Sequence, residues 1–228
     1  MRLRMTRIFL LMLLPVWLNG EALRDVLARM DAAAASFHAV KARIEKVSFT
    51  AVINDNTIER GTMCMSRRRS KADAIRMRVD FEPPDERSVA FHGQKAEIYY
   101  PKIKTVQEYD LGRQRALVDQ FLVLGFGTAS KQLARDYHIR LAGQEEVAGV
   151  SASHLELTPK SKKARERLVK VDLWIADPGG YPVRQKFFWP SNDTTTITYS
   201  AIELNPELSD RDLALELPPD VKREYPQR

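Results

Sequence analysis

The sequence predicts a β-rich α+β fold, in which helices cover the concave apolar face of one strongly curved antiparallel sheet of about eleven strands. Three observations support this prediction. Residues 47–112 and 138–202 largely alternate apolar and polar side chains, as half-buried strands do. Short turns rich in Gly, Pro, Asn and Asp separate these segments, which favours antiparallel neighbours. Twisted sheets of this size curl, so one face becomes concave and must be covered.

The first 22 residues are predicted to be a cleaved secretory signal. Three arginines precede the uncharged apolar run of residues 8–18, and small residues follow at Gly20 and Ala22. That run is too short for a membrane span, which needs about 20 residues. The alternative, a buried N-terminal helix, is disfavoured by the arginines. We therefore expect a periplasmic protein cleaved near Ala22, without a cysteine at its mature N-terminus for lipid attachment.

Residues 23–228 are expected to form one domain. This part holds 33 Lys and Arg against 29 Asp and Glu, a mild excess that suits an acidic lipid surface or partner without requiring nucleic acid. Nucleic-acid binding would also need exposed aromatic residues, whereas most aromatic residues here share the apolar face of their strands. Cys64 is the only cysteine, so no internal disulfide forms and stability must come from packing.

The secondary structure follows from the change of period along the chain. Apolar residues at i, i+3, i+4 and i+7 predict a helix over residues 23–40. The period then becomes two, and 75–81 is the clearest half-buried strand. The expected strands lie within residues 47–53, 61–66, 75–81, 89–91, 96–100, 106–109, 138–141, 152–157, 168–175, 182–189 and 194–202.

Residues 113–135 interrupt the β pattern with helical spacing, and Thr128 is predicted to cap a short second helix ending at Arg135. Gly125 and Gly127 flank an aromatic residue and give the backbone freedom to hinge. We interpret this interruption as a movable lid, with a plain packed helix as the alternative. The predicted lid residues are Leu117, Phe121, Leu122 and Phe126.

The two helical segments are too small to fill a large curved sheet, so a partly empty apolar trough is expected beneath them. Unbranched Met side chains suit such an adaptable wall, although ordinary core packing explains them equally well. Trp174 and Trp189 have the same two interpretations, with core favoured. The side chains predicted to line the trough are Phe49, Met63, Met65, Met77, Val79, Phe91, Ile98 and Tyr100.

The order of these parts resembles the LolA family of periplasmic lipoprotein carriers, together with its half-open-barrel relatives LolB and RseB. The resemblance covers the chain after the signal and is carried most specifically by RMRVDFEPPDERSVAFHGQKAEIYYPKIKTVQEYDL, and by YPVRQKFFWPSNDTTTITYSAIELNPEL near the C-terminus. The family has an Arg-Pro after the second strand, where the Arg holds the lid. Here the segment reads Ser66-Arg67-Arg68-Arg69-Ser70, which leaves open which Arg takes that role.

The resemblance implies a monomeric carrier that shuttles acylated lipoproteins or lipids from the inner toward the outer membrane. An inner-membrane release complex and an outer-membrane acceptor are the implied partners, and no cofactor is implied. The alternative is a sensor or regulatory module of the RseB type, which binds the same ligands without shuttling them. The missing lipid-attachment cysteine argues against LolB.

Catalysis finds little support in the sequence. Zinc-protease, CxxC, G-x-S-x-G and P-loop motifs are absent, and of four scattered histidines only His138 and His154 are expected to be neighbours across strands. We therefore expect neither an enzyme nor a metal site. Five cations cluster at Lys160, Lys162, Lys163, Arg165 and Arg167, in a predicted hairpin tip. They suit an anionic lipid or a release complex, although a solvated loop is the favoured interpretation.

Overall fold

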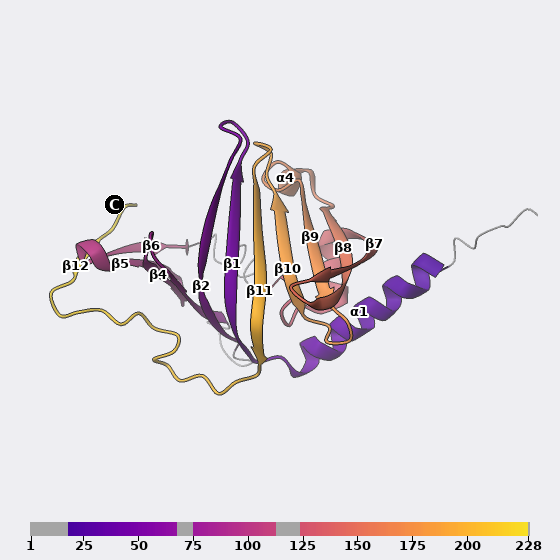
Figure 1. Cartoon of the computed structure of the whole chain (residues 1–228), viewed down its shortest axis with the longest axis horizontal. Helices are drawn as coiled ribbons and strands as arrows, with labels where there is room; N and C mark the ends of the chain where they lie inside the picture. Colours follow the sequence, from indigo (N-terminus) through magenta and orange to yellow (C-terminus); the bar gives the residue numbers. More distant parts are fainter. Residues whose placement is uncertain (1–17, 68–74, 113–123, 228) are drawn as a thin grey trace, which may run out of the picture.

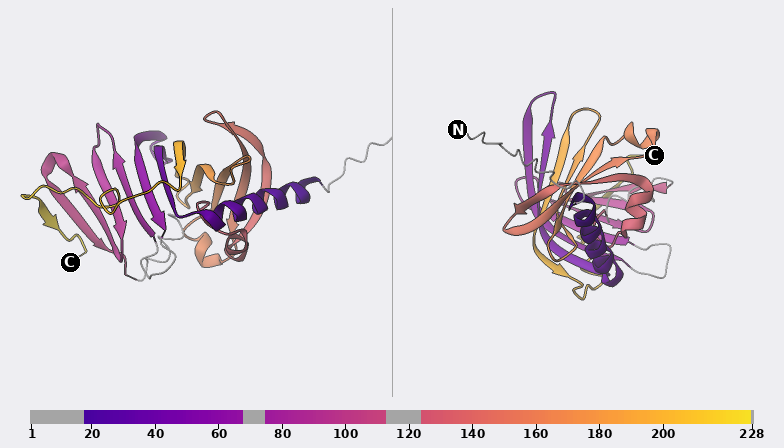
Figure 2. Two further views of the ribbon diagram at one scale, coloured as in Figure 1. Left: turned by 90° about the horizontal axis from the view of Figure 1, so that it is seen from below. Right: turned by 90° about the vertical axis from the view of Figure 1, so that its right-hand side faces the viewer.

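The protein is described by a computed structural model that places residues 18–67, 75–112 and 124–227. These residues form one twelve-stranded sheet with the strand order β12-β6-β5-β4-β3-β2-β1-β11-β10-β9-β8-β7 (Figure 1). The ribbon views show that the sheet curves strongly without closing (Figure 2). The predicted fold class, a curved antiparallel half-open barrel with helices on its concave side, is confirmed.

The sheet consists of two meanders that meet where β11 pairs with β1. The first contains β1 (Ala39–Thr50), β2 (Asp55–Arg67), β3 (Ile75–Phe81), β4 (Arg87–His92), β5 (Lys95–Tyr100) and β6 (Thr105–Asp110). The second contains β7 (Tyr137–Val147), β8 (Val150–Pro159), β9 (Lys170–Ala176), β10 (Pro182–Phe188) and β11 (Thr194–Leu204). The predicted strand 75–81 coincides with β3.

The part of the chain that the structure describes contains few helices. They are α1 (Leu18–Ser36), the single 3₁₀ turn η1 (Pro101–Ile103), α3 (Ser130–Asp136) and the four-residue α4 (Lys162–Arg165). The N-cap of α3 is Ala129, one residue after the predicted Thr128. The helix predicted to reach residue 40 ends earlier, at Ser36, because β1 begins at Ala39. In β1 the side chains of Val40, Ala42 and Ile44 point into the core. No helix in the described part of the chain combines the length and apolarity that crossing a membrane requires.

The concave face holds two main hydrophobic clusters. In the first, Val26 and Met30 of α1 pack on β7–β10 residues such as Leu155 and Leu173. Figure 2 shows α1 running along this half of the sheet. The second cluster joins β1, β2, β3 and β11 through residues such as Met65, and it includes Phe126 from the segment before α3. Helix α1 thus covers one half of the sheet, and residues 124–128 cover part of the other.

A strand absent from the sequence-based prediction completes the sheet. After β11, residues 205–221 pass along the face opposite the core, where Arg76 pairs with Asp210 and Arg78 donates a hydrogen bond to the Ala214 carbonyl over 2.8 Å. Leu213 of this segment is buried. The chain then reaches the far edge of the sheet, where β12 (Lys222–Glu224) pairs with β6 in parallel (Figure 1).

Candidate lipid-binding face

The strand register decides which predicted trough residues share a face. Directly opposed residues of antiparallel strands point to the same side of a sheet. Met63 opposes Ala42 and Val79, and Met65 opposes Val40 and Met77. The same face continues through the pairs Met77–Phe91, Val79–Val89 and Val89–Ile98, and Tyr100 lies two residues beyond Ile98 on the same strand. Seven of the eight predicted residues therefore line the concave face from β2 to β5.

Phe49 lies on the opposite face. It opposes Asn56 and Thr194, and the register between β1 and β2 runs without a shift from Ala39 to Thr50. Because Val40, Ala42 and Ile44 point into the core, odd-numbered residues of β1 point away from it. The expectation that Phe49 shares the face of the other seven is therefore wrong.

The large apolar side chains on this face are less buried on β4 and β5 than on β2 and β3. Met63, Met65, Met77 and Val79 are buried, with exposed fractions from 0% to 8%. Phe91, Ile98 and Tyr100, on β4 and β5, are only half-buried. α1 packs mainly against β7 and α3, on the other half of the sheet. The described structure thus leaves a continuous, partly exposed apolar strip on β4 and β5, next to a closed core.

Of the predicted lid residues, the structure describes only Phe126. It is 1% exposed and packs between Phe37 and Tyr199, with an edge-to-face arrangement to Tyr199 at a centroid distance of 5.2 Å. Leu117, Phe121 and Leu122 lie outside the described residues. Gly127 has a φ of +63°, and a Cβ there would stand 2.5 Å from the Phe37 ring. Only glycine fits this position without strain.

Residues 124–128 are held to the concave face by three side chains, which we call the clamp: Arg67, Gln185 and Tyr199. Arg67 donates a hydrogen bond from its guanidinium to the Gly127 carbonyl, and Gln185 donates one to the Leu124 carbonyl. The Tyr199 hydroxyl donates to Gln185 Oε1 over 3.1 Å. Arg67, the one arginine of residues 66–70 that the structure describes, thus holds the segment after the predicted lid.

Two of the three clamp side chains, Gln185 and Tyr199, are buried, which makes their hydrogen bonds important. Gln185 is 2% exposed and Tyr199 is 6% exposed. Burial raises the pKa of Tyr199, so its hydroxyl remains a donor at all physiological pH values. A buried polar group that loses its partner costs more than the hydrogen bond itself contributes. The segment that ends the predicted lid is therefore firmly attached to the sheet at its C-terminal side.

An ion cluster closes the apolar face at one end of β1 and β2. Glu59 accepts from Lys46 Nζ over 2.8 Å and pairs with Arg87, whose guanidinium also lies 4.2 Å from the centre of the Phe81 ring. Burial raises the pKa of Glu59, but the hydrogen bonds from Lys46 and Arg87 outweigh it, so its pKa lies below the usual 4.5. These charges mark the polar limit of the trough.

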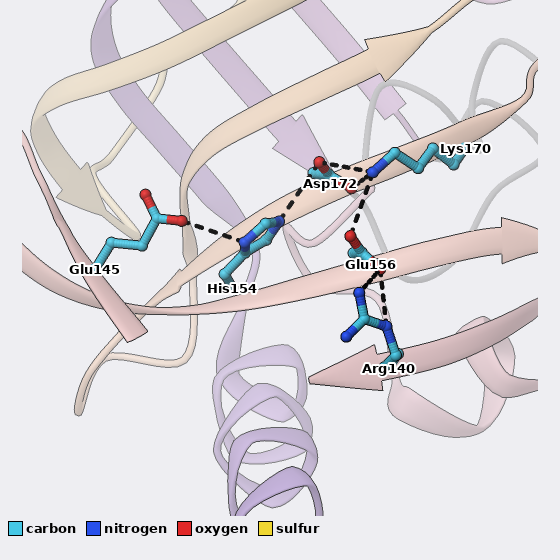
Figure 3. A network of polar contacts seen from close by, with 6 residues as sticks. All are labelled: Arg140, Glu145, His154, Glu156, Lys170 and Asp172. Atoms are coloured by element: carbon cyan, nitrogen blue, oxygen red, sulfur yellow. Dashed lines mark hydrogen bonds and ion pairs between the residues drawn. The ribbon is translucent and has the colours of Figure 1, made fainter. Parts of the chain in front are cut away.

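A second polar network lies on the opposite face of β7–β9 (Figure 3). His154 stacks on Trp174 at 4.4 Å and stands between two carboxylates, with Nδ1 3.2 Å from Glu145 and Nε2 3.5 Å from Asp172. Lys170 bridges Asp172 and Glu156. Trp174 therefore packs on the face away from the trough, whereas Trp189 stacks on the concave-face Phe187 and stays half-buried.

The geometry of this network favours ion pairing over metal binding. His154, Glu156 and Asp172 each offer one ligand atom within 4.8 Å of the others. The Lys170 ammonium already contacts both carboxylates, at 3.3 Å and 3.2 Å, and Arg140 pairs with Glu156 as well. A divalent cation would have to displace that ammonium, so the arrangement is an occupied salt-bridge network.

The histidines and the cysteine discussed in the sequence analysis are not brought together as a nucleophile and a base. His138 opposes Thr158, and His154 opposes Trp174 and Gly143. The two histidines are therefore not cross-strand neighbours, contrary to the expectation from the sequence. Cys64 opposes Lys41 and Arg78 on the face away from the trough, and burial raises the pKa of its thiol. A raised pKa keeps the thiol protonated and weakly nucleophilic.

Sequence reasoning missed the clamp. One signal was present, because Gln185 stands two residues before Phe187, at a position where the period of the strand calls for an apolar side chain. A polar residue at a core position needs a buried partner. The two partners of Gln185 lie far along the chain: the Tyr199 hydroxyl is 14 positions away and the Leu124 carbonyl is 61 positions away.

Comparisons with known proteins find similarity at the level of structure. Neither a protein-family model nor a curated protein matches the sequence. MucB superposes with a TM-score of 0.52 and 17% identity over 86% of this chain and 63% of MucB, so the chain spans less than two thirds of MucB. An uncharacterized conserved protein from Thermus thermophilus superposes with a TM-score of 0.52 and 11% identity, over 90% of this chain and 99% of that protein.

A third solved structure carries the family name. The LolA superfamily protein NE2245 from Nitrosomonas europaea aligns with 14% identity over 84% of this chain and 97% of its own, with a TM-score of 0.39. At such identities, similarity speaks to the fold and leaves activity open. The superposition on MucB, together with the open, curved sheet and the helix on its concave side, shows that the chain shares the fold of MucB.

Proposed function

We propose that this protein is a periplasmic carrier that binds the acyl chains of lipoproteins or lipids on its concave face and carries them from the inner toward the outer membrane. The observation that supports this proposal most is the half-buried strip of Phe91, Ile98 and Tyr100 beside the buried Met77 and Val79. Water-exposed apolar surface that continues into a core offers acyl chains a favourable environment.

The graded burial suits reversible binding. Sequestering a chain contributes about 0.8 kcal/mol per CH₂, so complete burial of a long chain would amount to about 10 kcal/mol and would make release slow. A strip that leaves part of its surface exposed holds a chain less tightly. A carrier can thus exchange its cargo without a large opening of the sheet.

The N-terminal sequence supports the proposed location. An arginine-rich start, an uncharged run of eleven residues and small residues near Ala22 are typical of exported proteins. Export would place the apolar face in the compartment between the two membranes. Acylated lipoproteins need an escort there because their acyl chains are insoluble in water.

The test is release of an acylated lipoprotein from inner-membrane vesicles by the purified protein, followed by delivery to outer-membrane vesicles. Ile98→Asp puts a charge on the half-buried strip and should abolish release while the sheet stays folded. Ile58→Asp is the matched control: Ile58 opposes Val47 on the other face, is 52% exposed, and should release cargo as the parent does. Equal release by all three proteins would contradict the proposal.

The same experiment addresses the alternative of a sensor without transport. MucB has been solved in complex with MucA, so a protein of this fold does bind a protein partner. If the present chain binds acylated ligand but never delivers it, and a stable protein partner is recovered with it from envelope extracts, the regulatory function replaces the carrier function.

A further inference from the structure

A pocket of about 600 Å³ lies at the end of the concave face where α3, β8, α4 and β10 meet. We call it the α4 pocket. Its apolar lining comes from Tyr137, Pro159, Leu168 and Trp189, the first three of them buried. Tyr137 and Leu168 belong to the hydrophobic cluster under α1, and Trp189 packs against it. The floor of the α4 pocket is therefore continuous with the apolar core of the concave face.

The rim of the α4 pocket is cationic. Lys160, Lys163, Arg135 and Arg167 line it, against Asp136 as its one acidic residue. Asp136 already accepts two hydrogen bonds from Arg135, at 2.9 Å and 3.0 Å, which hold the pKa of that carboxyl below its usual value. The acid of the rim is thus neutralised by one of its four cations.

Lys160 acts on Asp136 electrostatically, whereas Lys163 and Arg167 are left without an acidic partner in the described structure. Lys160 donates to the Ala134 carbonyl, which carries no net charge. Lys163 and Arg167 are exposed, and neither forms an ion pair with a described residue. Arg165 does not line the pocket and fixes the loop by donating to the Pro159 and Lys160 carbonyls, at 2.8 Å and 2.7 Å. A fixed loop holding unpaired cations is arranged to receive an anion.

We propose that the α4 pocket binds a phosphate-bearing amphiphile, with the phosphate at Lys160, Lys163 and Arg167 and the start of its acyl chain on Tyr137, Leu168 and Trp189. Lysine and arginine recognise phosphate through charge-assisted hydrogen bonds. The volume falls in the range of small-molecule sites, which suits a headgroup with the first part of a chain. This inference rests on the proposed function, because the rest of the chain would lie on the concave face.

The test compares ligands that share one acyl chain. Binding of myristoyl lysophosphatidate, of the uncharged monomyristoyl glycerol and of inorganic phosphate is measured by titration of the full chain below the micellar concentration. We expect the lysophosphatidate to bind about 150-fold more tightly than the glyceride, which corresponds to about 1 kcal/mol for each of the three phosphate-facing cations. Inorganic phosphate, which cannot use the apolar floor, should bind far more weakly than either.

Two double variants locate the preference. Lys163→Gln with Arg167→Gln removes two of the three phosphate-facing cations. It should reduce the preference for lysophosphatidate to about fivefold while leaving glyceride binding within about twofold. Lys131→Gln with Lys162→Gln makes the same change of charge on α3 and α4, outside the pocket lining, and should retain the preference. All four residues are exposed, so both variants should fold.

The outcomes separate this inference from the proposed function. Equal binding of lysophosphatidate and glyceride, or a preference that the loss of Lys163 and Arg167 leaves undiminished, overturns the phosphate site and leaves acyl binding in place. Inorganic phosphate binding as tightly as lysophosphatidate overturns the amphiphile and leaves a site for the free anion. If neither amphiphile binds, the phosphate site and the proposed function both fail.

Discussion

Replacing Tyr199 with Phe removes one hydroxyl from the clamp and little else. That hydroxyl donates to Gln185 Oε1 over 3.1 Å, and Gln185 in turn donates to the Leu124 carbonyl. The Phe ring retains the edge-to-face packing on Phe126. The amide oxygen of Gln185, in a side chain only 2% exposed, would be left without its donor. We therefore expect the free energy of unfolding to fall by about 1–3 kcal/mol.

Urea unfolding followed by circular dichroism measures this loss. With a denaturant slope of about 2 kcal/mol/M, the midpoint should fall by about 0.5–1.5 M. Tyr137→Phe is the matched control, because Tyr137 is equally buried at 6% exposed and its hydroxyl forms no hydrogen bond with a described residue. If the two variants lose the same amount of stability, the hydrogen bond to Gln185 does not hold residues 124–128 to the sheet, and the clamp is refuted.

Three further predictions concern the same face. Gly127→Ala should lower the free energy of unfolding by more than about 2 kcal/mol, because Gly127 has a φ of +63° and an added Cβ would stand 2.5 Å from the Phe37 ring. Gly143 has open space around it, so the control Gly143→Ala should leave the melting temperature unchanged. Arg67→Met removes the donor to the Gly127 carbonyl and should cost about 1–2 kcal/mol in urea unfolding; an unchanged midpoint would contradict this. The pKa of Glu59 is lowered, so its ion pairs stabilise the protein above pH 4.5, and this stabilisation is lost as the pH falls through the folded-state pKa. The difference in the free energy of unfolding between the parent and Glu59→Gln should therefore shrink on acidification. A constant difference from pH 7 to pH 3 would rule the linkage out.

Strands with a clean alternation were predictable, and β3 shows why. Ile75, Met77 and Val79 alternate with Arg76 and Arg78, and the structure places the first set in the core and the second on the other face. The start of β1 was not predictable in the same way. Phe37 and Val40 continue the helical spacing of residues 23–36 equally well, so the change of period at Ala39 carried no local signal.

Phe49 shows where the apolar-inside rule fails. The outer part of β1 forms a hairpin with β2 that projects beyond the core, with Val52 and Ile53 exposed at its tip (Figure 1). There the side chains that continue the core face are Lys46 and Ser48, and the apolar Val47 and Phe49 point the other way. The alternation of apolar and polar residues shows which side chains of a strand face the core only where the strand crosses a core.

The clamp and the α4 pocket were beyond the reach of local patterns for a different reason. Both are assembled from segments distant in the chain, as in the contact of Arg67 with Gly127 and the approach of Trp189 to Tyr137. The sequence alone showed a cluster of cations near residue 160. Only the fold shows that three of them surround an apolar floor.

The central claim is that acyl chains bind on the concave face, and quenching of tryptophan fluorescence by a brominated acyl chain tests it most directly. Trp189 lies on the concave side and Trp174 on the opposite face, stacked on His154. In the mature protein, from which the predicted cleavage near Ala22 removes Trp17, the variant that keeps only Trp189 should be quenched by a brominated fatty acid at concentrations where the variant that keeps only Trp174 is not. Quenching of Trp174 to the same extent, or of neither residue, would contradict binding on this face.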